Sequence, residues 1–261
     1  MICYDISIKQ RLKEVGTMNY KICYVFALAF FDAVLSTATL LNIPEPLLVP
    51  CNVGDLECLK RSTELFLRQT HKGIPALNIL PIDPLSIPVL EVQFPGDNLV
   101  YINKNITVTG LGHQRLEALK MDLRTGSVVL TTSADVNIHG DINQVFRNLG
   151  RSVAGHFWTY GRVLGTASYS YTLQRDSMGV EHYVVGPETT SCELVDTPVV
   201  SFSSQLAETC NDAFCPEEIK QLWKTNFCKI VEKAYVSVVH NIRAAAKVLP
   251  STAFFKNPHG F

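Results

Sequence analysis

Histidine is the side chain best suited to acid–base catalysis and metal binding near neutral pH, and the seven histidines of this chain are scattered along it. The sequence has no Gly-x-Ser-x-Gly elbow, no His-Glu-x-x-His zinc motif and no glycine loop of the phosphate-binding type. We therefore predict no metal, no cofactor and no enzyme activity. A secreted hydrolase with a triad assembled from distant residues remains an alternative, because such a triad leaves no local motif.

The cysteines indicate structural chemistry. From Cys51 onward their number is even, as in a disulfide-bonded extracellular protein, and no Cys-x-x-Cys indicates a zinc ribbon or a redox site. Cys51 and Cys58 are close in sequence and flank a helix start, so we predict that they pair. The other four cysteines allow three pairings. Of these we favour Cys210–Cys215 together with Cys192–Cys228.

The N-terminal region carries signals for secretion. Ile22–Phe31 is a short apolar run behind Lys21, and the small residues of Ser36-Thr37-Ala38 suit signal peptidase. We predict cleavage after Ala38. Residues 1–38 would then be an upstream segment and signal peptide, and residues 39–261 a single ligand-binding domain.

Two alternatives concern this region. The first is a true start at Met18. The second is an uncleaved signal anchor, against which Asp32 counts because it interrupts the apolar run.

Asn105-Ile106-Thr107 is a glycosylation sequon, so we predict a glycan on Asn105. The formal net charge of −1 gives no attraction to nucleic acid or anionic lipid.

Two helices are predicted. Apolar residues recur at spacings of three and four from Pro216 to Leu249, which predicts an amphipathic helix roughly 50 Å long. A shorter helix from Leu56 to His71 follows Asp55, a favoured N-cap residue. The prolines within residues 73–88 then predict an extended strap along the core.

Strands are predicted between the helices. Apolar and polar residues alternate from Val128 to Ile138, and a hairpin at Arg124–Ser127 joins this strand to an earlier one at 119–123. Further strands are predicted at 167–173, 180–186 and 192–202. In residues 141–160, apolar spacing predicts a short helix near Ile142–Leu149. The aromatic cluster His156–Tyr160 follows it, as either a cavity mouth or ordinary core.

A long one-sided helix covered mainly by strands predicts an α+β fold in which a strongly curved antiparallel sheet wraps the helix. The enclosed apolar interior could hold a small hydrophobic ligand, with polar anchors among Thr132, Tyr169, Tyr171 and Tyr235. Alternatively the interior is filled, and the protein is an extracellular interaction protein that acts by its surface. The residues predicted to line the cavity are Val128, Leu130, Val136, Tyr169, Tyr171, Trp223, Phe227, Val231, Tyr235 and Val238.

The order of these features resembles the insect takeout and haemolymph juvenile-hormone-binding protein family of the tubular lipid-binding superfamily. The resemblance rests on Cys51-x6-Cys58, the Gly-Ile-Pro…Asp-Pro-Leu…Ile-Pro stretch at 73–88, the segment 105–112 and the C-terminal helix. It implies a curved sheet around a long C-terminal helix, a short N-terminal helix and a Cys51–Cys58 disulfide. It also implies a secreted carrier, without enzyme activity, of juvenile hormone, another terpenoid, a fatty acid or an odorant. We expect a monomer that binds no nucleic acid and does not insert into membranes after signal cleavage.

Overall fold

The computed structural model describes residues 46–96, 98–203 and 217–258. Pro46–Phe261 form one compact unit. The predicted signal peptide, its cleavage after Ala38 and the Cys210–Cys215 pair lie outside the described residues. None of the described helices is both long enough and apolar enough to cross a membrane.

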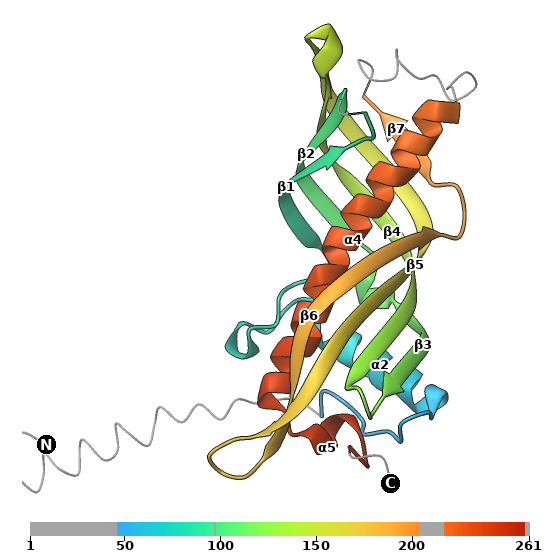
Figure 1. The fold of residues 1–261 in the computed structure, drawn as a ribbon. Coiled ribbons are helices and arrows are strands. Elements are labelled where there is room, and N and C mark those ends of the chain that lie inside the picture. Colours follow the sequence, from blue (N-terminus) through green and yellow to red (C-terminus); the bar gives the residue numbers. More distant parts are fainter. Residues whose placement is uncertain (1–45, 97, 204–216, 259–261) are drawn as a thin grey trace, which may run out of the picture. The chain divides into compact units, whose positions relative to one another are not determined.

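A strongly curved antiparallel sheet forms most of the unit (Figure 1), which confirms the predicted fold class. The central path of the sheet is β1-β2-β4-β5-β6, with β3 beside β4 and β7 beside β5. Strands β4 and β5 are the longest, at 20 and 25 residues, and pair along their whole common length. The described strands are β1 (Leu85–Gln93), β2 (Leu99–Thr109), β3 (Arg115–Asp122), β4 (Ser127–Phe146), β5 (Arg151–Arg175), β6 (Glu181–Leu194) and β7 (Val199–Phe202).

The sheet has two halves, because different strands flank the two ends of β4 and β5. In the upper half, β2 pairs with residues 137–146 of β4, and β7 pairs with residues 157–160 of β5. In the lower half, β3 pairs with residues 127–133 of β4, and β6 pairs with residues 163–175 of β5. Figure 1 shows β1, β2 and β7 around one end of the long helix and β3 and β6 around the other.

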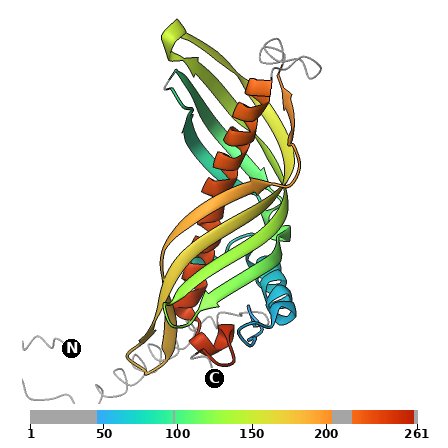
Figure 2. The same ribbon diagram turned by 45° about the vertical axis from the view of Figure 1, so that its right-hand side comes forward.

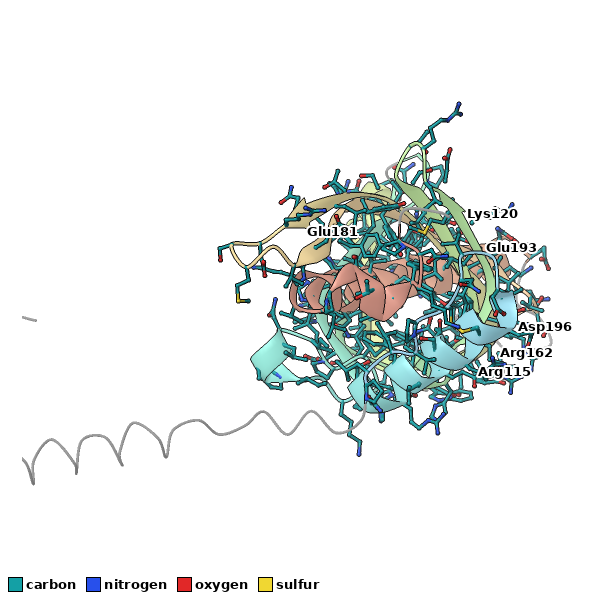
Figure 3. All side chains as sticks on the ribbon, turned by 90° about the horizontal axis from the view of Figure 1, so that it is seen from below. Arg115, Lys120, Arg162, Glu181, Glu193 and Asp196 are labelled. Atoms are coloured by element: carbon teal, nitrogen blue, oxygen red, sulfur yellow. A yellow bond between two sulfur atoms is a disulfide. The ribbon has the colours of Figure 1, made fainter. Side chains whose placement is uncertain are left out.

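Helix α4 (Glu217–Val248) runs along the concave side of this sheet (Figures 1 and 2), close to the predicted bounds of 216–249. Its side chains Ile230, Val231 and Ala234 are fully buried. Charged residues occupy the other face of the strands, and Arg115, Lys120 and Arg162 are exposed there. Figure 3, seen along the helix from below, shows these charged side chains around the outside of the unit.

Helix α2 (Leu56–Thr70) is the predicted first helix, and the carboxylate of Asp55 caps it by accepting a hydrogen bond from the Cys58 N–H at 3.1 Å. It packs against β3 in the lower half. The short helix α5 (Ser251–Phe254) lies at the same end. There the Cys51 N–H donates to the Phe254 carbonyl at 3.2 Å, and the Lys256 N–H donates to the Cys51 carbonyl at 2.9 Å. The two ends of the described chain therefore meet.

The helix predicted near Ile142–Leu149 is wrong, because β4 continues to Phe146. A short 3₁₀ turn, η3 (Arg147–Leu149), then leads into β5, and Leu149 is 63% exposed. Gly140 and the buried Gln144 lie on the inward face of β4 and interrupt the alternation of apolar and polar residues. The sequence pattern therefore did not indicate a strand here. Gly140 is needed there, because a Cβ atom would lie 2.9 Å from the Lys104 carbonyl oxygen.

The aromatic cluster His156–Tyr160 belongs to β5 and alternates between its two faces. Phe157 points into the core and is 3% exposed, whereas Trp158 is 43% exposed on the outer face. Phe157 packs in the core of the upper half, and none of residues 156–160 lines the apolar cavity of the lower half.

The strap at residues 73–88 is only partly extended. Pro75 begins a short 3₁₀ turn, η1 (Pro75–Leu77), since proline is compatible with the first turn of a helix. Pro88 lies in the edge strand β1, where a missing N–H is tolerated. The Asn241 side chain holds the strap on α4 by accepting from the Leu80 N–H and donating to the Leu80 carbonyl, both at 2.8 Å.

The structure contains two of the predicted disulfides. Cys51–Cys58 ties the segment before α2 to the first turn of that helix. Cys192–Cys228 joins β6 to α4, with 5.3 Å between the Cα atoms. The second bond therefore attaches the long helix to the sheet near the boundary between the two halves.

A buried pair of amides also joins α4 to the sheet. Asn103 on β2 and Asn226 on α4 are both 0% exposed. The Asn103 Nδ2 donates to the Asn226 Oδ1 at 2.9 Å, and the Asn226 Nδ2 donates to the Asn103 Oδ1 at 3.1 Å. Because a buried amide needs such partners, this pair fixes how the helix sits on the strand.

We predict that Asn226→Leu lowers the free energy of unfolding by about 1–3 kcal/mol, because the Asn103 amide is left buried without its partner. The double variant Asn103→Leu/Asn226→Leu should lose less than the sum of the two single variants. Urea unfolding followed by circular dichroism measures these differences. If the loss in the double variant equals the sum of the losses in the two single variants, the two amides do not stabilise each other.

Candidate ligand-binding cavity

A cavity of about 150 Å³ lies in the lower half of the sheet, and every element of that half contributes to its wall. Helices α2 and α5 contribute to the wall together with β3–β6 and α4. Most of the lining side chains are apolar. The wall consists of Leu48, Leu59, Ser62, Thr63, Phe66, Leu67, Gln114, Leu119, Met121, Val128, Leu130, Thr132, Tyr169, Tyr171, Tyr183, Val185, Val238, Ile242, Ala246, Phe254 and Phe255.

The structure divides the residues predicted to line a cavity into two groups. Those in the wall are Val128, Leu130, Tyr169, Tyr171 and Val238. Those in the packed core of the upper half, away from the cavity wall, are Val136, Trp223, Phe227, Val231 and Tyr235. The two groups are separated along the length of α4, because residues 223–235 cover the upper half and residues 238–246 cover the lower half.

Large rings fill the upper half. The Trp223 ring centroid lies 4.5 Å from that of Phe202, 5.4 Å from that of Tyr101 and 5.8 Å from that of Phe157. Tyr101 and Phe227 are among the largest fully buried side chains. Among the described residues, packed side chains fill the core of this half, and the apolar cavity lies in the other half.

Sequence reasoning missed several wall residues, for different reasons. Leu119 and Met121 belong to a strand whose alternation was recognised, so their inward direction could have been inferred. Phe66 lies on the apolar face of α2, but the sequence does not say what that face covers. Tyr183 and Phe254 come from the far end of the chain, and no local pattern places them beside α2.

A chain of hydrogen bonds forms one polar end of the cavity. The Thr132 hydroxyl donates to the Gln114 Oε1 at 2.8 Å and lies 2.7 Å from the Tyr235 hydroxyl. Since Thr132 has a single proton to give, Tyr235 is the donor in the second bond. The Gln114 Nε2 in turn donates to the Leu111 carbonyl at 2.7 Å. Of these residues, Gln114 and Thr132 line the cavity, and both have protein partners.

Tyr235 reaches Thr132 only because β5 has a glycine opposite it. A Cβ atom at Gly165 would overlap the Tyr235 ring and its hydroxyl oxygen. Gly165 pairs with Thr132 across β4 and β5, so the tyrosine lies over this pair of residues. The glycine thus serves close packing rather than an unusual backbone angle.

Burial raises the pKa of Tyr169 to about 12. Burial also raises the pKa of Tyr235 to about 12, although the hydrogen bond with Thr132 acts in the opposite direction. Both hydroxyls are therefore neutral near physiological pH, so Tyr169 adds no charge to the cavity wall and Tyr235 adds none to the hydrogen-bond chain beside it. Such a wall suits an uncharged ligand.

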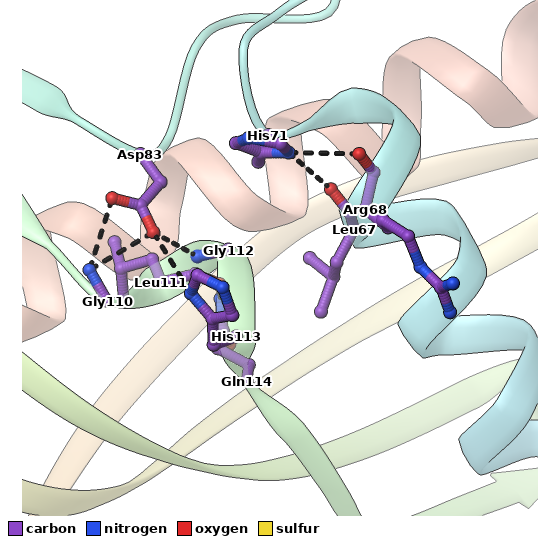
Figure 4. Close-up of polar contacts among 9 residues, drawn as sticks. All are labelled: Leu67, Arg68, His71, Asp83, Gly110, Leu111, Gly112, His113 and Gln114. Carbon is purple, nitrogen blue, oxygen red and sulfur yellow. Dashed lines mark hydrogen bonds and ion pairs between the residues drawn. The ribbon is translucent and has the colours of Figure 1, made fainter.

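Polar groups outside the cavity have structural partners. The Asp83 carboxylate accepts from the Gly110 N–H at 3.1 Å and from the Gly112 N–H at 2.9 Å (Figure 4), so it holds the turn η2 (Leu111–His113) against the strap. On the outer face, His156 Nδ1 contacts Asp141, and the His156 backbone N–H donates to the Ser203 hydroxyl at 3.2 Å. Across the described ranges, no group of three or more His, Cys, Asp or Glu residues could hold a metal ion.

The curved sheet, the long helix and the apolar cavity between them define a protein of the takeout fold. The crystal structure of Takeout 1 from Epiphyas postvittana superimposes with a TM-score of 0.68, at 18% sequence identity, over 79% of this chain and 98% of that one. Residues 25–144 match the model of the haemolymph juvenile hormone binding protein family. The juvenile hormone-binding protein of Manduca sexta is 41% identical over 219 residues, which are 79% of this chain and 94% of that protein. The chain belongs to the takeout and haemolymph juvenile hormone-binding protein family, as the sequence resemblance indicated.

We predict that Gly165→Ala lowers the free energy of unfolding by about 1–3 kcal/mol, because the added methyl group displaces the Tyr235 ring. In the background of Tyr235→Leu the same change should cost clearly less, since the hydroxyphenyl group is gone. Thermal and urea unfolding of the four proteins in this cycle measure the coupling. An equal cost in both backgrounds would mean that the glycine has another role.

We also predict a loss of stability in alkaline solution. Tyrosine in the unfolded chain ionises near pH 10, whereas Tyr235 in the folded protein ionises near pH 12. The contribution of the protonated Tyr235 to the free energy of unfolding is fully present below about pH 10. It is lost as the pH rises toward 12, because the unfolded state releases the proton first. Two pKa units amount to roughly 3 kcal/mol. Urea unfolding at several alkaline pH values should show this fall, and Tyr235→Phe should reduce it; an unaltered pH dependence in that variant would contradict the assignment.

Proposed function

We propose that this protein is a secreted, non-enzymatic carrier that holds a small hydrophobic ligand in the lower cavity. The observation that carries the proposal is the apolar cavity lined by α2, α4, α5 and the sheet. A relative that is 41% identical is named a juvenile hormone-binding protein, which supports a ligand of that chemical kind. Juvenile hormone, another terpenoid, a fatty acid and an odorant-like molecule all belong to the proposed class.

Secretion is supported by the disulfides and by the predicted signal peptide. Cys51–Cys58 and Cys192–Cys228 are the kind of bond that persists in an oxidising compartment. The proposed glycan site, Asn105, is exposed on the outer face, and its Nδ2 donates to the Asp141 Oδ2 at 2.8 Å. An N-linked sugar leaves one N–H on this nitrogen, so glycosylation is compatible with that bond.

The size of the void limits the ligand that fits without rearrangement. About 150 Å³ is close to an engineered void that binds benzene and lies below the roughly 300–1,000 Å³ of common ligand pockets. A terpenoid or a fatty chain therefore has to displace some wall side chains. Met121 is the wall residue best suited to move, because its side chain is unbranched and flexible.

The packed core of the upper half favours a second candidate function. If the lower cavity takes up no ligand in solution, the protein is an extracellular interaction protein of the same fold that acts by its surface. Native mass spectrometry of protein secreted from insect cells separates the two. Co-purified lipid supports the carrier, whereas empty protein that takes up no added probe supports the interaction protein. Ester hydrolysis lost on replacing one Ser or His would instead indicate a hydrolase.

We predict that Val238→Phe lowers the affinity for a fluorescent fatty-acid probe at least about tenfold, because the larger ring fills the cavity beside Ile242 and Ala246. Val199→Phe is the matched control, since Val199 is 59% exposed on β7 and should leave the affinity unchanged. Fluorescence titration measures both, with circular dichroism to confirm folding. Unchanged affinity in a folded Val238→Phe protein would place the probe elsewhere.

A further inference from the structure

Three exposed side chains form an apolar patch on the outer face of the upper half. These are Trp158 and Tyr160 of β5 and Val199 of β7, and we call them the outer patch. They are 43%, 36% and 59% exposed, and Val199 pairs directly with Tyr160. The residues that pair with Trp158 are polar, namely His139 on β4 and Ser201 on β7. A contiguous exposed apolar patch with a polar rim marks an interaction site.

The glycosylation sequon places a sugar attachment point on the same face of the sheet. Asn105 is exposed, and its backbone φ of 50° lies in the left-handed region, which asparagine tolerates better than most residues. It belongs to a β-bulge, because the register of β2 with β4 shifts between Lys104, which pairs with Asp141, and Thr107, which pairs with His139. Asn105 therefore lies between these two rows of paired residues.

The same two rows continue across β4 to β5. Asp141 pairs with His156, and His139 pairs with Trp158. Trp158 is thus two strands away from Asn105, a separation of about 10 Å at the usual strand spacing. The inner part of an N-linked glycan consists of two N-acetylglucosamine units, which can bridge a gap of that size.

The Asn105 amide has a fixed direction. Its Nδ2 donates to the Asp141 Oδ2 at 2.8 Å, and the Asp141 carboxylate also contacts the His156 Nδ1. The hydrogen bond from Asn105 lowers the pKa of Asp141, so the carboxylate is charged at neutral pH and holds the amide. Because the sugar replaces the other hydrogen of this nitrogen, it leaves the sheet in one direction.

A groove of about 500 Å³ gives a sugar room beside this amide. It crosses β2, β4 and β5, and its lining includes Lys104, Asp141, Asn143, Ala154 and His156. The lining combines charged and amide groups with small apolar ones. A sugar ring has the same combination, since its hydroxyl groups both donate and accept hydrogen bonds while its C–H groups are apolar. The groove reaches His156, the outward neighbour of Trp158 along β5.

We propose that the N-linked glycan of Asn105 folds back across β4 and stacks on the Trp158 ring, so that the protein covers its outer patch with its own sugar. The C–H groups on one face of a sugar ring are slightly positive, and the face of the indole ring is slightly negative. The polar edge of the sugar then meets the groove at Asp141 and His156. The inference rests on the proposed secretion and glycan site, and it is independent of the cavity and its ligand.

The test uses the full-length protein secreted from insect cells and two variants of the sequon. Thr107→Ser keeps the sequon, whereas Thr107→Val removes it and keeps a branched side chain in the strand. Mass spectrometry of the peptide that contains Asn105 shows whether the sugar is present. These two variants therefore compare the protein with and without its glycan, and Asn105 itself is unchanged in both.

Acrylamide quenching of tryptophan fluorescence then reports the environment of the outer patch. The chain has two tryptophans, and Trp223 is only 4% exposed, so the quenching comes mainly from Trp158. We expect the quenching constant of Thr107→Ser to be at least about twofold lower than that of Thr107→Val, because the stacked sugar covers the exposed face of the ring.

Unfolding temperatures test the contact itself. The difference in unfolding temperature between Thr107→Ser and Thr107→Val contains the contribution of the sugar and the direct effect of the two side chains. Adding Trp158→Thr to both should lower the temperature of Thr107→Ser relative to Thr107→Val by about 2–4 °C, since only the sugar contribution depends on the ring. Val184→Thr is the matched control, because Val184 is also 43% exposed but lies on β6 in the lower half, and it should leave the difference unchanged.

Nuclear magnetic resonance detects the stack directly. Protons that lie above an indole ring resonate upfield, because the ring current opposes the applied field there. We expect upfield shifts for protons of the inner N-acetylglucosamine units in the natural protein and in Val184→Thr, and their absence in Trp158→Thr. Unshifted sugar signals in the natural protein would exclude the proposed contact.

The outcomes separate the proposals. If Asn105 carries no sugar, the glycan site fails and this inference fails with it, while the carrier function is unaffected. If the sugar is present but quenching is equal in Thr107→Ser and Thr107→Val, the glycan stands and its contact with Trp158 is wrong. Quenching that falls as the protein concentration rises, equally in both variants, would assign the outer patch to a second copy of the chain and would also overturn the inference.

Discussion

The packing of α4 against the concave face of one antiparallel sheet is the interaction on which the rest of the molecule depends. A helix of 32 residues cannot bury its apolar stripe alone, and the sheet covers it only because β4 and β5 are long enough to follow it. The buried amides of Asn103 and Asn226 fix the helix in the upper half, and the Cys192–Cys228 disulfide fixes it near the boundary. Below that boundary the same geometry continues with smaller side chains.

The sizes of the side chains on α4 decide where the interior is solid and where it is hollow. The first turns of the helix carry Trp223 and Phe227, which belong to one buried cluster with Tyr101 and Phe157, and the Trp223 ring packs beside the rings of those two residues. The last turns carry Val238, Ile242 and Ala246, which are smaller side chains and line the cavity. The void therefore follows from the taper in side-chain volume along one helix. Helices α2 and α5 are then needed to cover its open sides.

Much of the fold could be predicted from the sequence, because the relevant patterns are local. The spacing of apolar residues placed α4 within one residue at each end, and alternation identified the strand from Val128. The same test failed after Ile138, where Gly140 makes room for the neighbouring strand and Gln144 is buried without being apolar. The cavity was harder to predict, since the candidate residues were chosen only because their side chains lie on the inward faces of helix and strands. An inward position does not distinguish Val231, which packs in the upper core, from Val238, which lies beside the cavity.

The meeting of the chain ends at Cys51 and Phe254 has a consequence for biosynthesis. The lower half needs backbone hydrogen bonds that join Cys51 to Phe254 and Lys256, residues more than two hundred positions apart. A ribosome releases the first of these long before the last. The upper core can begin to form once α4 has been made, but the wall of the cavity is completed only after translation of residue 256. Contacts so distant in sequence slow folding, so the apolar side chains of the cavity wall stay exposed in a nascent molecule until residue 256 has been made.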